Sequence, residues 1–142
     1  MIAVIDASVA AKWFFQEPDS DRARDLLEQV KRGQVLLLAP ELLAAEIGSM
    51  LWKRVLREGV SLDDATAQYA RFKRVSVALV RITRLVDSAL LLALRHRHSI
   101  YDCLYVALAL EVPCDLLTAD ERLYRTFRPS FPRVRLLHNW PA

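Results

Sequence analysis

The sequence predicts an α/β fold in which a central parallel sheet of about five short strands is flanked by helices on both faces. Short apolar runs without polar alternation recur along the chain, as is typical of strands buried on both faces. The segments between them carry apolar residues at helical spacing. With 142 residues, 54% of them hydrophobic and only 3 of them glycine, we expect one compact domain over residues 1–142.

The expected strands are short and strongly apolar. The first, IAVI, is a continuous apolar run, and the third is rich in β-branched side chains. Their spacing along the chain leaves room for a helical crossover between most neighbouring strands, which a parallel sheet requires. The five expected strands cover residues 2–5, 35–38, 75–82, 116–117 and 134–137.

The expected helices are marked by apolar stripes and by residues that begin or end a helix. Gly33 and Gly59 each follow a helical pattern and can end it. Pro40 stands where a first helical turn tolerates proline, and Ser61 with Asp64 forms a capping pair. The expected helices cover residues 8–15, 19–33, 40–59, 61–74, 86–94, 99–111 and 121–127.

Four carboxylates stand at positions that this fold gathers together. Asp6 and Asp120 follow expected strands, Asp102 opens an apolar helix, and Glu46 projects from a mainly apolar helix face. Ligands of such sheets bind at the carboxyl ends of the strands, near the point where strand order reverses. Each Asp can also be explained singly as a helix cap. Glu46 has no such explanation, and unpaired buried acids are costly.

Taken together, the four acids indicate a metal site. Carboxylates placed close together repel one another unless a cation is present. Oxygen ligands without His or Cys favour Mg²⁺ or Mn²⁺ over zinc, and such ions support phosphodiester hydrolysis by activated water. Ser8 and Thr118 each lie two residues from a proposed ligand. They can orient the acids or cap helices.

Two basic clusters suit a nucleic-acid partner. The formal net charge is +3, but if metal neutralised the four acids, 20 basic residues would face 13 acidic ones. One cluster follows Glu46 on its helix and the other precedes Asp102; both can hold a phosphate backbone or be solvated helix ends. The clusters are Lys53, Arg54 and Arg57, and Arg95, His96, Arg97 and His98.

Other features restrict the setting of the protein. No basic stretch precedes the first apolar run, and Asp6 interrupts that run too early for a signal peptide. The longest apolar stretch, residues 103–110, is far shorter than the roughly 20 residues that a membrane-spanning helix needs. Cys103 and Cys114 lie in apolar settings without metal-binding spacing, so we expect reduced thiols in a cytoplasmic protein.

Four segments closely resemble, in order and spacing, the PIN domain, and specifically the VapC-type toxins of bacterial and archaeal toxin–antitoxin pairs. The segments are DASVAAKWF, PELLAAEI, SIYDCLYVALA and LLTADERL, and the likeness runs over essentially the whole chain. The resemblance implies a metal-dependent endoribonuclease that uses Mg²⁺ or Mn²⁺. On the family pattern the metal-binding residues are Asp6, Glu46, Asp102 and Asp120, with Ser8 and Thr118 as polar support.

The same resemblance implies partners. VapC-like proteins are typically homodimers that cut a structured RNA, often transfer RNA or ribosomal RNA. A cognate VapB-like antitoxin inhibits them by threading a segment across the active-site groove. Cys103 stands where the family commonly has a small Ala, and none of the four acids is missing.

Two other Mg²⁺-binding classes fail on residue type. A phosphatase of the haloacid dehalogenase type needs a second Asp where Ser8 stands. A receiver domain needs an acidic pair after the first strand, but here Asp6 is single and Ile5 precedes it. It also needs a Lys after the fifth strand, but here His138 and Asn139 follow that strand. The alternative that the residues leave open is a non-cleaving module of the same fold that binds RNA or a protein partner.

Overall fold

Five parallel strands form the centre of the structure, a computed structural model that describes residues 1–141. Their order in the sheet is β3-β2-β1-β4-β5, which confirms the expected parallel sheet. The strands are β1 (Ile2–Ile5), β2 (Leu36–Pro40), β3 (Val77–Val80), β4 (Asp115–Thr118) and β5 (Val134–Leu136).

The strand order reverses between β1 and β4. The chain first builds the sheet outward from β1 through β2 to β3, and then returns to the other side of β1 to add β4 and β5. Ile5 pairs with Leu117 across this boundary, and the Asp6 N–H donates to the Leu117 carbonyl. The carboxyl ends of β1 and β4 therefore lie side by side, where ligands of such sheets bind.

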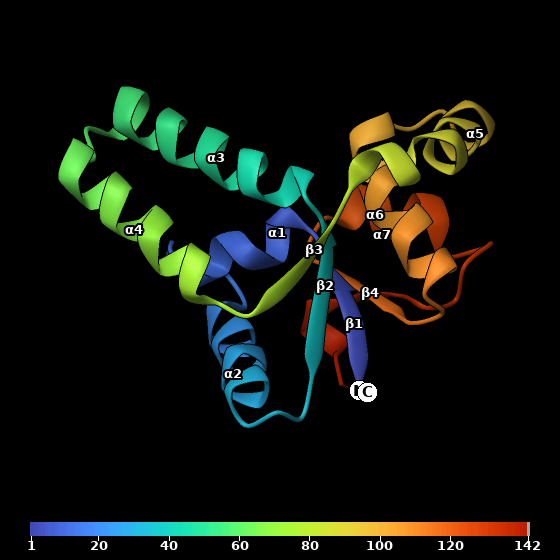
Figure 1. Ribbon diagram of the computed structural model, residues 1–142, viewed down its shortest axis with the longest axis horizontal. Coiled ribbons are helices and arrows are strands. Elements are labelled where there is room, and N and C mark those ends of the chain that lie inside the picture. The colour runs from blue at the N-terminus through green and yellow to red at the C-terminus, as the bar shows by residue number, and fades with distance from the viewer. Residues whose placement is uncertain (142) are drawn as a thin grey trace.

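Helices cover both faces of the sheet, as expected from the sequence. Figure 1 shows α1 to α4 on one side of the strands and α5 to α7 on the other. The helices are α1 (Ala7–Ala10), α2 (Ser20–Lys31), α3 (Leu42–Glu58), α4 (Leu62–Arg74), α5 (Val86–His96), α6 (Ile100–Glu111) and α7 (Glu121–Phe127). Residues 1–141 also contain three 3₁₀ turns: η1 (Ala11–Trp13), η2 (Ile82–Arg84) and η3 (Leu137–Asn139).

The α6 helix is the central helix of its layer. Every residue from Cys103 to Ala109 is buried, because α5 covers the helix on one side and strands β1, β2 and β4 lie against the other. A helix that is apolar all round is typical of such an interior position. Both cysteines are buried and free, as expected.

A few boundaries differ from the expected ones. Pro40 ends β2 instead of opening a helix, and α3 begins at Leu42. The third strand is shorter than expected, because Val75 ends α4 and Ile82 begins η2. The helix expected over residues 8–15 is the short α1 followed by the 3₁₀ turn η1.

Candidate active site

Asp6 lies buried at the carboxyl end of β1, with both carboxylate oxygens engaged. Ser8 Oγ donates to Oδ1 and Thr118 Oγ1 donates to Oδ2. The same hydroxyls accept backbone N–H groups from the turn after β4, Ala119 N–H to Ser8 at 2.8 Å and Asp120 N–H to Thr118 at 3.0 Å. The side chain also caps α1 by accepting the Val9 N–H at 3.3 Å. Ser8 and Thr118 therefore link Asp6 to the end of β4 and the turn that follows it.

The electrostatic setting of Asp6 disfavours its charge. Burial raises the pKa of Asp6 from 3.8 to about 6, although the hydrogen bonds from Ser8, Thr118 and Val9 act in the opposite direction. The negative charge of Asp102 raises it further. In the absence of a cation, the site thus holds a carboxylate that is costly to ionise.

Glu46 lies on α3 and faces α6. Tyr105, a buried residue of α6, donates its hydroxyl to Glu46 Oε1 at 2.6 Å. Burial raises the pKa of Glu46, the bond from Tyr105 lowers it, and the charge of Asp102 raises it. Burial, with the adjacent Glu46 charge, also raises the pKa of the Tyr105 hydroxyl.

Asp102 lies in the first turn of α6, and its charge acts on both Asp6 and Glu46. The capping pair suggested by the sequence is only half formed, because Ser99 Oγ accepts the Tyr101 N–H at 3.2 Å. Asp102 Oδ2 instead contacts His98 Nε2 at 2.8 Å. A simple helix cap therefore does not account for this residue.

A groove between α3 and the start of α6 brings Glu46 and Asp102 together. Its walls come from the first half of α3 and the first turn of α6. Tyr101 lies at its edge and is 62% exposed. The lining residues are Leu42, Ala45, Glu46, Ser49, Ser99, Tyr101 and Asp102.

Asp120 has the clearest structural role of the four acids. It caps α7, with Oδ1 accepting the Arg122 N–H at 2.9 Å and the Leu123 N–H at 3.2 Å. Its backbone N–H reaches the site through Thr118, whose hydroxyl also donates to Asp6. The backbone of Asp120 is therefore connected to Asp6, while its side chain caps α7.

The donor set suits a hard divalent cation. Asp6, Glu46 and Asp102 offer only carboxylate oxygens, and the charge of Asp102 raises the pKa of the other two. Over residues 1–141, no three His, Cys, Asp or Glu side chains are grouped closely enough to hold one ion as they stand. Hydrogen bonds from Ser8, Thr118, Tyr105 and His98 hold the three acids instead.

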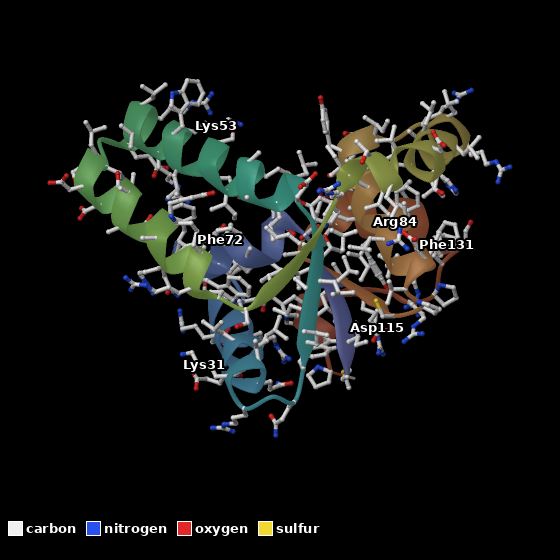
Figure 2. All side chains as sticks on the ribbon, viewed as in Figure 1. Lys31, Lys53, Phe72, Arg84, Asp115 and Phe131 are labelled. Carbon is white, nitrogen blue, oxygen red and sulfur yellow. The ribbon has the colours of Figure 1, made fainter. Side chains whose placement is uncertain are left out.

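The basic clusters are only partly free for a phosphate backbone. On α3, Arg54 pairs with Glu58 at 2.9 Å and stacks over the Phe15 ring, whereas Lys53 is exposed on the same helix (Figure 2). Arg95 and Arg97 are exposed at the end of α5. The two histidines beside them differ from the expectation, because both pack against the buried Phe127 ring.

Sequence reasoning missed the partners of two acids. The interval of four residues between His98 and Asp102 is one along which helical side chains can meet, and it was the available signal for their contact. Tyr105 carried no such signal, because Glu46 lies 59 positions away along the chain.

The comparisons with known proteins agree with this architecture. The model of the PIN domain matches residues 3–128, so the chain belongs to the PIN domain family. Ribonuclease VapC3 of Pyrobaculum aerophilum is 32% identical to it over 131 residues, which cover 89% of this chain and 95% of the relative.

Two solved structures share the fold at low sequence identity. Mycobacterium tuberculosis VapC20, described as a sarcin-ricin loop cleaving toxin, superposes with a TM-score of 0.70 at 16% identity, over 94% of this chain and 98% of that one. VapBC2 from Rickettsia felis, bound to a DNA fragment from its promoter, superposes with a TM-score of 0.63 at 13% identity. The match covers 96% of this chain and 97% of that one. At such identities the likeness establishes the fold.

Proposed function

We propose that this protein is a VapC-type toxin, an endoribonuclease that hydrolyses RNA phosphodiester bonds with Mg²⁺ or Mn²⁺. The observation that carries the proposal is the placement of three carboxylates, at the end of β1, on α3 and in the first turn of α6, beside the strand-order reversal. The charge of Asp102 raises the pKa of both Asp6 and Glu46. The relatives named VapC ribonucleases support the same activity.

In this proposal Asp6, Glu46 and Asp102 hold the ion, with Asp120 at the edge of the site. The ion, when bound, supplies activation of water and neutralisation of phosphate charge. Ser8 and Thr118 orient the Asp6 carboxylate, and Tyr105 orients that of Glu46. The groove between α3 and α6 admits the RNA strand to the acids.

The RNA contacts are proposed to come from basic residues that lie along the chain near the two helices that form this groove. Lys53, Arg54 and Arg57 lie further along α3 from Glu46, and Arg95 and Arg97 precede α6. The neighbour VapC20 is described as acting on the sarcin-ricin loop, so ribosomal RNA is a sensible first substrate, with transfer RNA beside it. A VapB-like antitoxin is the expected inhibitor, as the VapBC2 pair suggests.

We also propose a homodimer, with α5 as its contact surface. Leu90, Leu91 and Leu94 are 46%, 56% and 69% exposed, and Val86 lies on the same stripe. An exposed apolar patch of this kind is typical of an interaction site.

Along residues 1–141, no helix is both long and apolar enough to cross a membrane.

The test is an RNA cleavage assay on purified protein. We expect fragments of ribosomal or transfer RNA with Mg²⁺ or Mn²⁺, none with EDTA, and none from Asp102→Asn. Asp63→Asn is the matched control, since Asp63 is an exposed acid in the first turn of α4, and it should cut as the unaltered protein does.

Two outcomes would contradict the proposal. Cleavage that survives both EDTA and Asp102→Asn would indicate a contaminating nuclease or another mechanism. RNA binding without cleavage under any divalent ion would instead support the non-cleaving module.

A further inference from the structure

We propose that His98 is a positioning residue that fixes Asp102 for metal binding. The inference rests on the proposed function, because it gives Asp102 a role as a ligand. What it adds is the residue that selects which carboxylate oxygen of Asp102 faces the metal.

The contact between the two side chains is short and shielded. His98 Nε2 lies 2.8 Å from Asp102 Oδ2, and the His98 side chain is only 4% exposed. An ionised carboxylate can only accept hydrogen bonds, so the Nε2 atom must carry the hydrogen and donate it. The Asp102 side chain is 33% exposed, so the burial of His98 limits competition from water on the imidazole side of the bond.

Aromatic packing also restrains the His98 ring, in addition to its contact with Asp102. The His98 ring packs edge-on against the buried Phe127 ring, with centroids 5.3 Å apart. Phe131, on the α7 side of the molecule in Figure 2, packs against Phe127 in turn. An imidazole held this way has little freedom to swing away from Asp102.

The backbone conformation of the residue before His98 also helps to place the His98 side chain. Arg97 has a φ of 52°, in the left-handed region, which is strained for a residue other than glycine. This conformation ends α5 and turns the chain so that His98 enters the interior before α6 begins. The left-handed conformation thus belongs to Arg97, the residue directly before His98.

The pairing leaves one ligand oxygen available. In the part of the chain that the structure describes, Asp102 Oδ1 has no hydrogen-bond partner, while Oδ2 is occupied by His98. Both oxygens of Asp6, by contrast, accept hydroxyl bonds. His98 therefore presents Oδ1 of Asp102 as the free ligand atom. Hydrogen-bond partners of metal ligands typically contribute 10- to 100-fold in metal affinity.

The experiment measures Mn²⁺ affinity by electron paramagnetic resonance on the full chain without RNA. We expect His98→Leu, which keeps the volume but removes the donor, to weaken Mn²⁺ binding about 10- to 100-fold. His98→Gln places an amide nitrogen near the Nε2 position and should restore most of the affinity. His98→Asn places it near Nδ1 and should not.

His96→Leu is the matched control. His96 packs against the same Phe127 ring, with centroids 4.8 Å apart, and within residues 1–141 it forms no hydrogen bond or ion pair with an acid. This variant therefore loses an imidazole from the same aromatic cluster. Its Mn²⁺ affinity should stay within about twofold of the unaltered protein. If His96→Leu and His98→Leu weaken binding equally, the effect is a packing effect and the proposal fails.

Asp102→Asn separates failure of this inference from failure of the proposed function. If Asp102→Asn leaves Mn²⁺ affinity unchanged, the metal site itself is wrong. If Asp102→Asn weakens binding and His98→Leu does not, only the role of His98 is overturned. A true positioning role also predicts that His98→Leu adds no further loss in the Asp102→Asn background. Should His98→Leu not fold, the difference between the Gln and Asn variants decides the same question.

Discussion

At the scale of single residues, the site is a balance between burial and hydrogen bonding. Asp6 is 5% exposed and accepts bonds from two hydroxyls and one backbone N–H, yet its pKa is still raised. The bonds therefore do not fully replace the water that the carboxylate has lost. A site that keeps such a residue gives up stability in the metal-free state.

Asp6→Asn should stabilise the metal-free protein at pH 8. Because the pKa of folded Asp6 is about 6, against 3.8 for the ordinary residue, its contribution to stability is present below about pH 4 and lost as the pH rises through 6. The loss is of the order of 3 kcal/mol. Asn keeps the helix-capping ability, so the gain at pH 8 should approach that amount and nearly vanish at pH 4.

The measurement is urea unfolding of both proteins in EDTA at the two pH values. Destabilisation by Asp6→Asn at pH 8 would mean that the bonds from Ser8 and Thr118 outweigh the burial cost. In that case Asp6 would act mainly as a structural cap.

The sequence predicted the positions of the acids better than their partners. Asp6 could be placed because strand ends in a parallel sheet meet at one edge, and Glu46 because it interrupts an apolar helix face. Tyr105 could not be placed, since every residue of α6 from Cys103 to Ala109 is buried and their periodicity does not say which residue faces α3. The bond to Glu46 depends on how two helices pack, which no local pattern encodes.

At the scale of elements, α3 determines where Glu46 lies and Gly59 determines where α3 ends. Gly59 has a φ of 69° and its N–H bonds to the Arg54 carbonyl, closing the last turn. Gly48, in the middle of the same helix, has ordinary helical geometry. A Cβ at either position would meet nothing within 4 Å, so backbone conformation alone should decide the effect of alanine.

Opposite effects are therefore expected from the same substitution in one helix. Gly59→Ala should lower the free energy of unfolding by about 1 kcal/mol or slightly more, because alanine is strained at positive φ. Gly48→Ala should raise it by about 1 kcal/mol, because alanine has the higher helix propensity. Urea unfolding midpoints measure both, and shifts of the same sign would show that α3 does not have the described boundaries.

Helix ends marked by a glycine or a capping serine could be predicted from the sequence, whereas strand ends could be predicted less well. Gly59 and Ser61 mark their helices by backbone and side-chain chemistry that is local to the sequence. The third strand was expected over residues 75–82 but covers Val77–Val80. Its ends depend on pairing with β2, and the β-branched residues beyond that pairing carry no signal of where it stops.

At the scale of the whole molecule, the fold places its polar chemistry and its apolar surface on different elements. The acids come from the end of β1, from α3 and from α6, whereas the group of exposed leucines formed by Leu90, Leu91 and Leu94 lies on α5. Val86, Leu90 and Leu94 recur every four residues, so they form one line along that helix, with Leu91 beside it. The apolar spacing predicted the helix itself, and the structure shows that Ala89 is buried while Leu90 and Leu94 face outward.

The proposed homodimer predicts that a charge on this stripe separates the subunits. Leu94→Glu introduces a carboxylate at a position that is 69% exposed in the single chain, so the monomer should fold normally. In a dimer the same carboxylate would be buried without a partner, at a cost of several kcal/mol. Sedimentation velocity at micromolar concentration should therefore show a dimer for the unaltered protein and a monomer for Leu94→Glu.

Leu62→Glu provides the control, because Leu62 is 74% exposed at the start of α4, on the other side of the sheet from α5 (Figure 1). It makes the same change in charge and should leave the dimer intact. If both variants remain dimeric, α5 is not the contact surface. If the unaltered protein is a monomer at all concentrations tested, the exposed leucines serve another partner, and the groove between α3 and α6 must bind RNA within a single chain.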